Sequence, residues 1–298
     1  MARYSTTWLK AVVLLGGLAG GAWLYLNWQT LADNYALSHY TSSSEVGQII
    51  DRLNLTHHAK AVLYRAQPQI DDKTAFNQDC QTRPHELELG CYYHGRIYIL
   101  RIDNASLAPE MTVVTAHELL HAVWAELPAA GRQRLSSQLE AEYTALNDND
   151  LNDRMKSYAV SEPGEQANEL HSILATEYAS LPAGLATYYA QYFNDRAVVT
   201  ADHAAYEQVF AARRQQLEQD LATIRDKKAQ LAVLNRRMEA LRSSGQIAAY
   251  NALVPGQNKL VDDINARIDQ YQAAVVEYNA LSKSLDSQEI TDTETAAQ

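Results

Sequence analysis

The chain has 298 residues, with 25 Lys or Arg against 36 Asp or Glu, which gives a formal net charge of −11. This balance argues against general nucleic-acid binding, because it leaves no excess of cations to replace the counterions of phosphates. A hydrophobic fraction of 47% excludes wholesale disorder, and two cysteines are too few for a four-thiolate metal site.

The N-terminal region contains an apolar run, residues 11–28, that carries no charge and has aromatic residues at its far end. Its length suits one crossing of a bilayer. Arg3 and Lys10 precede the run, and Asp33 is the first charge after it, so the positive-inside rule places the N-terminus in the cytoplasm. We therefore predict a single-pass cell-membrane protein, anchored within residues 1–29, with the remainder outside. A signal peptide cleaved near residues 20–22 is the alternative.

After the anchor, residues 30–43 are expected to form a polar linker to a domain that spans residues 44–201. Ser44–Leu53 has a helix-start signal and helical apolar spacing. Ala59–Ala66 (AKAVLYRA) and Gly95–Ile102 (GRIYILRI) are predicted strands.

Two cysteines, Cys80 and Cys91, flank the polar loop before the second predicted strand. In an oxidising compartment a pair this close would form a disulfide that clamps the loop, and two unlinked thiols are the alternative. Beyond Pro109 the pattern predicts four helices, at residues 111–127, 131–146, 164–180 and 184–194.

The C-terminal part, residues 202–285, has heptad-like apolar spacing and a fourteen-residue repeat of Asn-Ala pairs. A break at Ser243–Gly245 predicts an antiparallel helical hairpin, and Pro255-Gly256 predicts a kink or restart in its second helix. Residues 286–298 are expected to be a disordered tail. The fold class is therefore α+β: a mainly helical domain with a small sheet, followed by a coiled-coil hairpin.

The chemistry resides in residues 111–127, which read MTVVTAHELLHAVWAEL. His117 and His121 are one helical turn apart, so both imidazoles can bind one Zn²⁺, and Glu118 can take a proton from a metal-activated water. A substrate peptide could pair with the edge of the preceding strand. The alternative is a helix whose histidines are merely structural.

This motif resembles that of the zinc metallopeptidases. Trp124 and Leu127 stand where metzincins have Gly and His, so that clan is excluded. Gluzincins take a third ligand from a glutamate on a later helix, and Asn168-Glu169-Leu-His-Ser172 is similar to part of the thermolysin-type NExxSD motif. The resemblance, which covers about residues 90–180, implies a zincin-like catalytic domain with Glu169 as the third ligand.

Other acidic residues compete with this assignment. Glu140 and Glu177 remain alternatives for the third ligand. Ile173 stands where thermolysin-like enzymes have an Asp that orients a zinc-bound histidine, and Glu177 is a candidate for that role as well.

A group that stabilises the oxyanion is also expected. Ser157-Tyr158 is similar to the Ser-Tyr pair that precedes the ligand glutamate in anthrax lethal factor, which makes Tyr158 the first candidate. His171 is the second.

Together these features predict a membrane-anchored, extracytoplasmic zinc endopeptidase that acts on a peptide or protein substrate. The alternative is a non-catalytic envelope scaffold with a relic or structural zinc site, which binds a protein partner or a second copy through its C-terminal helices. Substrate preference is not encoded in these motifs.

Overall fold

The computed structural model describes residue 23, residues 27–80 and residues 89–285. The expected membrane span at 11–28 lies largely outside these residues, and the expected tail at 286–298 lies wholly outside them. Within the described part of the chain, no helix is both long and apolar enough to cross a membrane. The fold divides into two compact units, one up to Arg101 with Glu110–His203, the other comprising Ile102–Pro109 and the chain from Ala204 onward.

The first unit contains a three-stranded mixed sheet in the order β1-β3-β2. β3 (Arg96–Leu100) is the central strand, parallel to β1 (Gln69–Asp71) and antiparallel to β2 (Gly90–Tyr93). Its last four residues are all buried, as a strand covered on both faces requires. The strand expected at Gly95–Ile102 is thus confirmed, and β2 forms an outer edge of the sheet.

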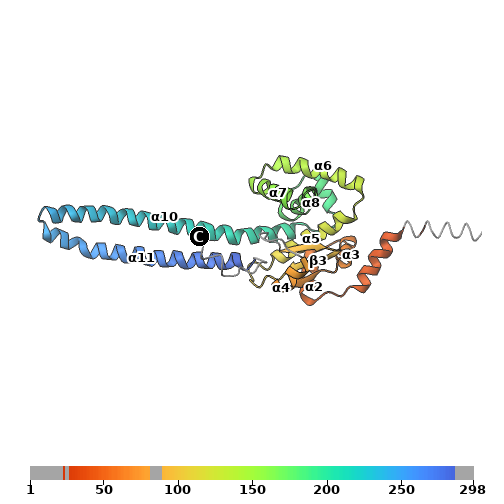
Figure 1. Ribbon diagram of the computed structural model, residues 1–298, viewed down its shortest axis with the longest axis horizontal. Coiled ribbons are helices and arrows are strands. Elements are labelled where there is room, and N and C mark those ends of the chain that lie inside the picture. The colour runs from red at the N-terminus through yellow and green to blue at the C-terminus, as the bar shows by residue number, and fades with distance from the viewer. Residues whose placement is uncertain (1–22, 24–26, 81–88, 286–298) are drawn as a thin grey trace, which may run out of the picture. The chain divides into compact units, whose positions relative to one another are not determined.

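Several helices cover this sheet (Figure 1). α2 (Ser44–Leu53) confirms the helix expected there, and the Ser43 hydroxyl caps it by accepting a hydrogen bond from the Val46 amide. α4 (Lys73–Cys80) is joined to β2 by the Cys80–Cys91 disulfide, which confirms the predicted pair. This link fixes the edge strand to the body of the unit.

The strand predicted at Ala59–Ala66 is wrong, because these residues belong to helix α3 (His57–Arg65). The Thr56 hydroxyl accepts a hydrogen bond from the Ala59 amide and so starts the helix. Ala59, Val62 and Leu63 lie on its buried face, which is the spacing of a helix.

The remaining helices of this unit follow the sheet in the sequence. α5 (Glu110–Glu126), α6 (Ala129–Leu146), α8 (Gln166–Glu177) and α9 (Ala183–Tyr189) confirm the four predicted helices, with ends shifted by a few residues. α7 (Asn149–Ser161) was not expected. Its signal is Asp148, whose carboxylate accepts hydrogen bonds from the amides of residues 150 and 151.

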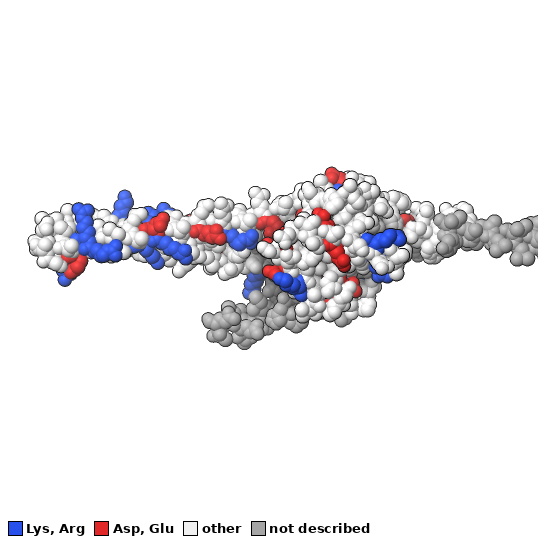
Figure 2. Space-filling view, turned by 90° about the horizontal axis from the view of Figure 1, so that it is seen from above, with Lys and Arg blue, Asp and Glu red and all other residues white. Residues whose placement is uncertain are grey.

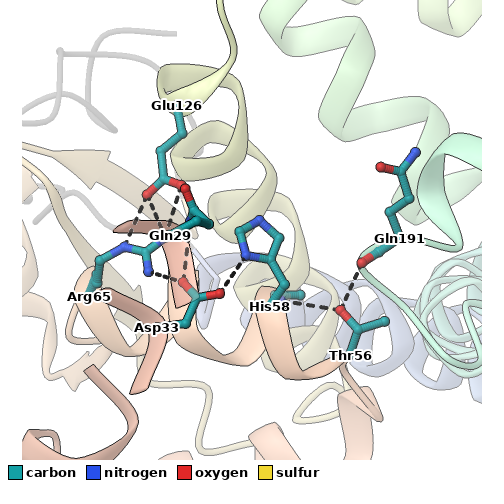
Figure 3. A network of polar contacts seen from close by, with 8 residues as sticks. Gln29, Asp33, Thr56, His58, Arg65, Glu126 and Gln191 are labelled. Atoms are coloured by element: carbon teal, nitrogen blue, oxygen red, sulfur yellow. Dashed lines mark hydrogen bonds and ion pairs between the residues drawn. The ribbon is translucent and has the colours of Figure 1, made fainter. Parts of the chain in front are cut away.

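Residues 27–39 are helical, although the sequence suggested a polar linker. The reason is visible in Figure 3: Asp33 is buried and bonded to two residues of α3. His58 Nδ1 lies 2.9 Å from one carboxylate oxygen, and Arg65 donates to the other at 2.6 Å. Arg65 also pairs with Glu126 at the end of α5, so the helix at residues 27–39 is joined through Asp33 and Arg65 to the body of the unit.

The second unit is dominated by the hairpin of α10 (Ala197–Ser243) and α11 (Ile247–Lys283) (Figure 1). The break between them confirms the expected turn, where Gly245 has a φ of 75°. Cross-helix ion pairs join Arg213 to Glu277 and Lys227 to Asp263, in the order that antiparallel helices require. α11 does not restart at Pro255 but continues through it.

Candidate metal centre

The candidate centre is built on α5, which is buried along nearly its whole length. A helix that is apolar on all sides suits an interior position. β2, β3, α2, α3 and α8 pack around it. His117 and His121 are the half-buried positions of this helix, because they face a cavity rather than the core.

His117 and His121 meet Glu169 from α8 at this cavity, so their ligand atoms form one group within 4.8 Å. The Nε2 atoms lie 3.5 Å and 3.4 Å from the two carboxylate oxygens of Glu169. A tetrahedral ion held at about 2.0–2.1 Å would place neighbouring ligand atoms about 3.4 Å apart. This His-His-Glu group therefore fits a metal ion, and the third member is Glu169.

The electrostatics keep Glu169 in the form that binds a cation. Burial alone would raise the pKa of Glu169, but His121 and His117 outweigh burial and hold this pKa below its usual value. A buried carboxylate between two imidazoles is thus ionised and ready to act as a ligand.

Asn168 orients one of the two histidines. Its side-chain oxygen lies 3.0 Å from Nδ1 of His121, so the imidazole donates its Nδ1 proton there and keeps the lone pair of Nε2 for a metal. The Asn168 amide group in turn donates to Glu165 at 3.1 Å. The sequence motif included Asn168, but Glu177 was the residue expected to orient a histidine.

Glu118 lies on the same helix and lines the same cavity, with 5% of its surface exposed. Burial raises the pKa of Glu118, although His121 and His117 act in the opposite direction. Gly90 of β2 packs directly against it: a Cβ on Gly90 would lie 3.0 Å from the Glu118 carboxylate oxygen. A side chain at position 90 would therefore displace Glu118.

The cavity has a volume of about 450 Å³ and is bounded by β2, α5, α7 and α8. Tyr158 of α7 lines it, and burial raises the pKa of the phenol, so Tyr158 stays protonated and can donate a hydrogen bond. Tyr158 therefore lines the same cavity as Glu169.

The residues considered as alternative third ligands or as a second oxyanion donor lie outside the His-His-Glu group. Glu140 is exposed on α6 and is not part of the His-His-Glu group. Glu177 forms a two-pronged ion pair with Arg154 at 2.5 and 2.9 Å. His171 is fully buried, bonds to the Tyr188 hydroxyl at 3.0 Å and does not line the cavity.

Burial and the nearby histidines lower the pKa of His171 to about 3, so it is a neutral core residue. Because His171 lies in the core and does not line the cavity, its expected role as second oxyanion donor is wrong.

A polar cluster of His203, Glu110 and Glu177, two of which line the cavity, was not predicted. His203, near the start of α10, lies 3.6 Å from Glu110 and 3.7 Å from Glu177. Glu110 opens α5 and is itself buried. Because these residues come from three helices distant in the sequence, no local motif marks them.

Comparison of the chain with models of known families, with curated proteins and with solved structures found no match. The function is therefore inferred from the site itself.

Proposed function

We propose that the protein is a zinc-dependent endopeptidase of gluzincin type. Its zincin-like catalytic domain would be anchored to the cell membrane by the N-terminal segment and lie on the outer side of that membrane. The observation that carries the proposal is the convergence of His117, His121 and Glu169, with Glu118 beside them, on one cavity. Two imidazoles and one carboxylate are a usual donor set for a catalytic zinc, which keeps its fourth position open.

The proposal gives a defined role to the three metal ligands, to Glu118 and to Tyr158. A zinc ion held by the three ligands would lower the pKa of a bound water molecule and polarise the scissile carbonyl. Glu118 accepts the proton of the attacking water and delivers it to the leaving amine, a role for which its raised pKa is suited. Tyr158 donates a hydrogen bond to the developing oxyanion.

The substrate would pair with β2 rather than with β3. β3 is the central strand, so its edges are occupied by β1 and β2. Gly90, Cys91 and Tyr92 of β2 line the cavity, and β2 has no further strand beyond it among the described residues. An extended peptide added to this edge would run along the metal ligands.

The charge of the cavity favours cationic substrates. Six of its lining residues are glutamates, and no Lys or Arg is among the described lining residues. Glu169 is assigned to the metal and Glu177 is paired with Arg154, whereas Glu162 and Glu165 lie on the loop before α8. We expect peptides with Lys near the scissile bond to be cleaved faster than the same peptides with Gln or Glu.

The location outside the membrane is supported by two observations. The Cys80–Cys91 disulfide is typical of an oxidising compartment. The helix at 27–39 exposes Trp28, the last residue of the apolar run, at 69%, and Tyr35, seven residues beyond it, at 65%. Such aromatic side chains are typical of the membrane–water interface.

The proposal is tested by metal content and peptidase activity of the full chain. We expect about one zinc per chain, lost in Glu169→Ala, and cleavage of a peptide library that is lost in Glu118→Gln while zinc is retained. Glu140→Gln, at an exposed glutamate, is the matched control. Full peptidase activity in Glu118→Gln, or zinc retained in Glu169→Ala, would refute the assigned roles.

A non-catalytic scaffold is the second candidate, because α10 and α11 form a long hairpin that the proposed chemistry does not use. Under this reading, deletion of residues 203–298 abolishes the biological effect and Glu118→Gln leaves it intact. The reverse pattern supports the enzyme.

A further inference from the structure

The end of the hairpin has a charge opposite to that of the whole chain. We define the hairpin tip as residues 227–261, which contain six Lys or Arg and a single Glu. The tip therefore carries a formal charge of +5 in a chain whose total is −11. Figure 2 shows these basic side chains gathered toward the free end of the hairpin.

Most of these cations take no part in holding the hairpin together. Lys227 pairs with Asp263, and Arg242 lies 3.9 Å from Glu239. The other four are exposed and have no ion pair with any residue that the structure describes: Lys228, Arg236, Arg237 and Lys259. Acidic residues follow Arg236 and Lys259 by about one turn, at Glu239 and at Asp262 and Asp263, but form no ion pair with them. Lys228 and Arg237 have no acidic residue one turn away on their helix, so no such pair accounts for them.

Apolar side chains are exposed beside the cations. Val233 is 58% exposed on α10 and Ile247, just after the turn, is 53% exposed. The one aromatic residue of the tip, Tyr250, is half-buried, and single-stranded nucleic acid is usually bound through stacked, accessible aromatics. Clustered cations beside exposed aliphatic side chains fit a surface of anionic headgroups over an acyl layer.

We propose that the hairpin tip binds membranes rich in anionic phospholipid. α10 extends about 60 Å from Ala204 to the turn, which gives the tip a long reach. The attraction is electrostatic, with each Lys or Arg near such a surface worth about a fivefold change in binding. Two cations removed together should therefore reduce the bound-to-free ratio of the tip about 25-fold, and salt should weaken binding.

The experiment uses the full chain reconstituted in lipid vesicles, with a fluorophore on Ser244→Cys in the turn. The two native cysteines are joined in a disulfide and do not react. Energy transfer is measured to headgroup-labelled lipid, placed in the same vesicles or in added protein-free vesicles. Phosphatidylcholine alone is compared with phosphatidylcholine mixed with phosphatidylglycerol, at about 0.1 M and about 0.5 M salt.

The test variant is Arg236→Gln with Arg237→Gln, and the matched control is Arg132→Gln with Arg134→Gln on α6. Both remove two arginines in favour of another good helix former. We expect energy transfer only with phosphatidylglycerol, lost at high salt and in the test variant but kept in the control.

Three results of the lipid measurement would overturn the proposal. They are transfer that is equal on neutral lipid, a test variant that behaves as the control does, and the absence of transfer in either vesicle arrangement. Transfer between two labelled copies in place of transfer to lipid would assign the tip to a second copy of the chain, and would also overturn it.

Discussion

Asn168 offers a sharp test of the metal site, because its oxygen is 3.0 Å from Nδ1 of His121 but not itself a ligand. Asn168→Leu removes this acceptor and lets the imidazole rotate or change tautomer. Loss of such an orienting partner typically reduces metal affinity 10- to 100-fold, which corresponds to about 1.4–2.7 kcal/mol. Asn168→Asp keeps an acceptor at the same position and should retain most of the affinity.

The assay is competition for zinc between the full chain and a chelator of known affinity, at fixed pH. Asn168 also donates to Glu165 at 3.1 Å, so Glu165→Ala is included to remove this bond alone. We expect a small effect there, because the Glu165 carboxylate is exposed. Unchanged zinc affinity in Asn168→Leu would refute the orienting role, and equal losses in Asn168→Leu and Glu165→Ala would assign the effect to the second bond.

Gly90→Ala should reduce peptidase activity about 100-fold with zinc retained, because the added Cβ would lie 2.4 Å from Val114 and 3.0 Å from the proposed base Glu118, and so would displace both. Gly131→Ala, whose nearest contact is 3.8 Å, is the control, and equal activities of the two variants would contradict this prediction. Replacing Cys80 and Cys91 by Ser should lower the free energy of unfolding by about 3 kcal/mol through loop entropy, which denaturant unfolding measures; no change would argue against a stabilising disulfide. Asp33→Asn should cost about 2 kcal/mol at pH 7. Burial opposes ionisation of Asp33, but its His and Arg partners hold its pKa below the usual 3.8, so this stabilisation is complete above about pH 4 and is lost as pH falls through the lowered pKa. Unfolding measured at several pH values should show the difference closing only below about pH 4, and a difference that closes near neutrality would contradict the assignment.

The sequence was sufficient to predict that His117, His121 and Glu169 come together, and to predict most helices, because these depend on local spacing. His117 and His121 are fixed by the period of one helix, and Glu169 by a short motif on another. The strand predicted at Ala59–Ala66 shows the limit: a short apolar run has the same appearance in a strand and a buried helix. Thr56, a helix-capping residue just before the run, is the local feature that favours the helix.

What the sequence could not provide is the set of contacts between distant segments. Asn168 meets His121 across 47 positions, and Asp33 meets Arg65 across 32. The second of these contacts turns an expected linker into a helix fixed to the domain. Such pairs depend on how whole helices pack, which no periodicity in a single segment reveals.

The candidate ligands His121 and Glu169 are separated by about 50 residues, which include all of α6 and α7. A metal bound there would act as a removable cross-link that closes this segment into a loop. Binding only to the folded chain, it would raise the melting temperature with metal concentration. A chelator would then loosen α6 and α7 as one cooperative segment before the sheet opens, so amide exchange and protease nicks in this segment would report metal loss earlier than global unfolding.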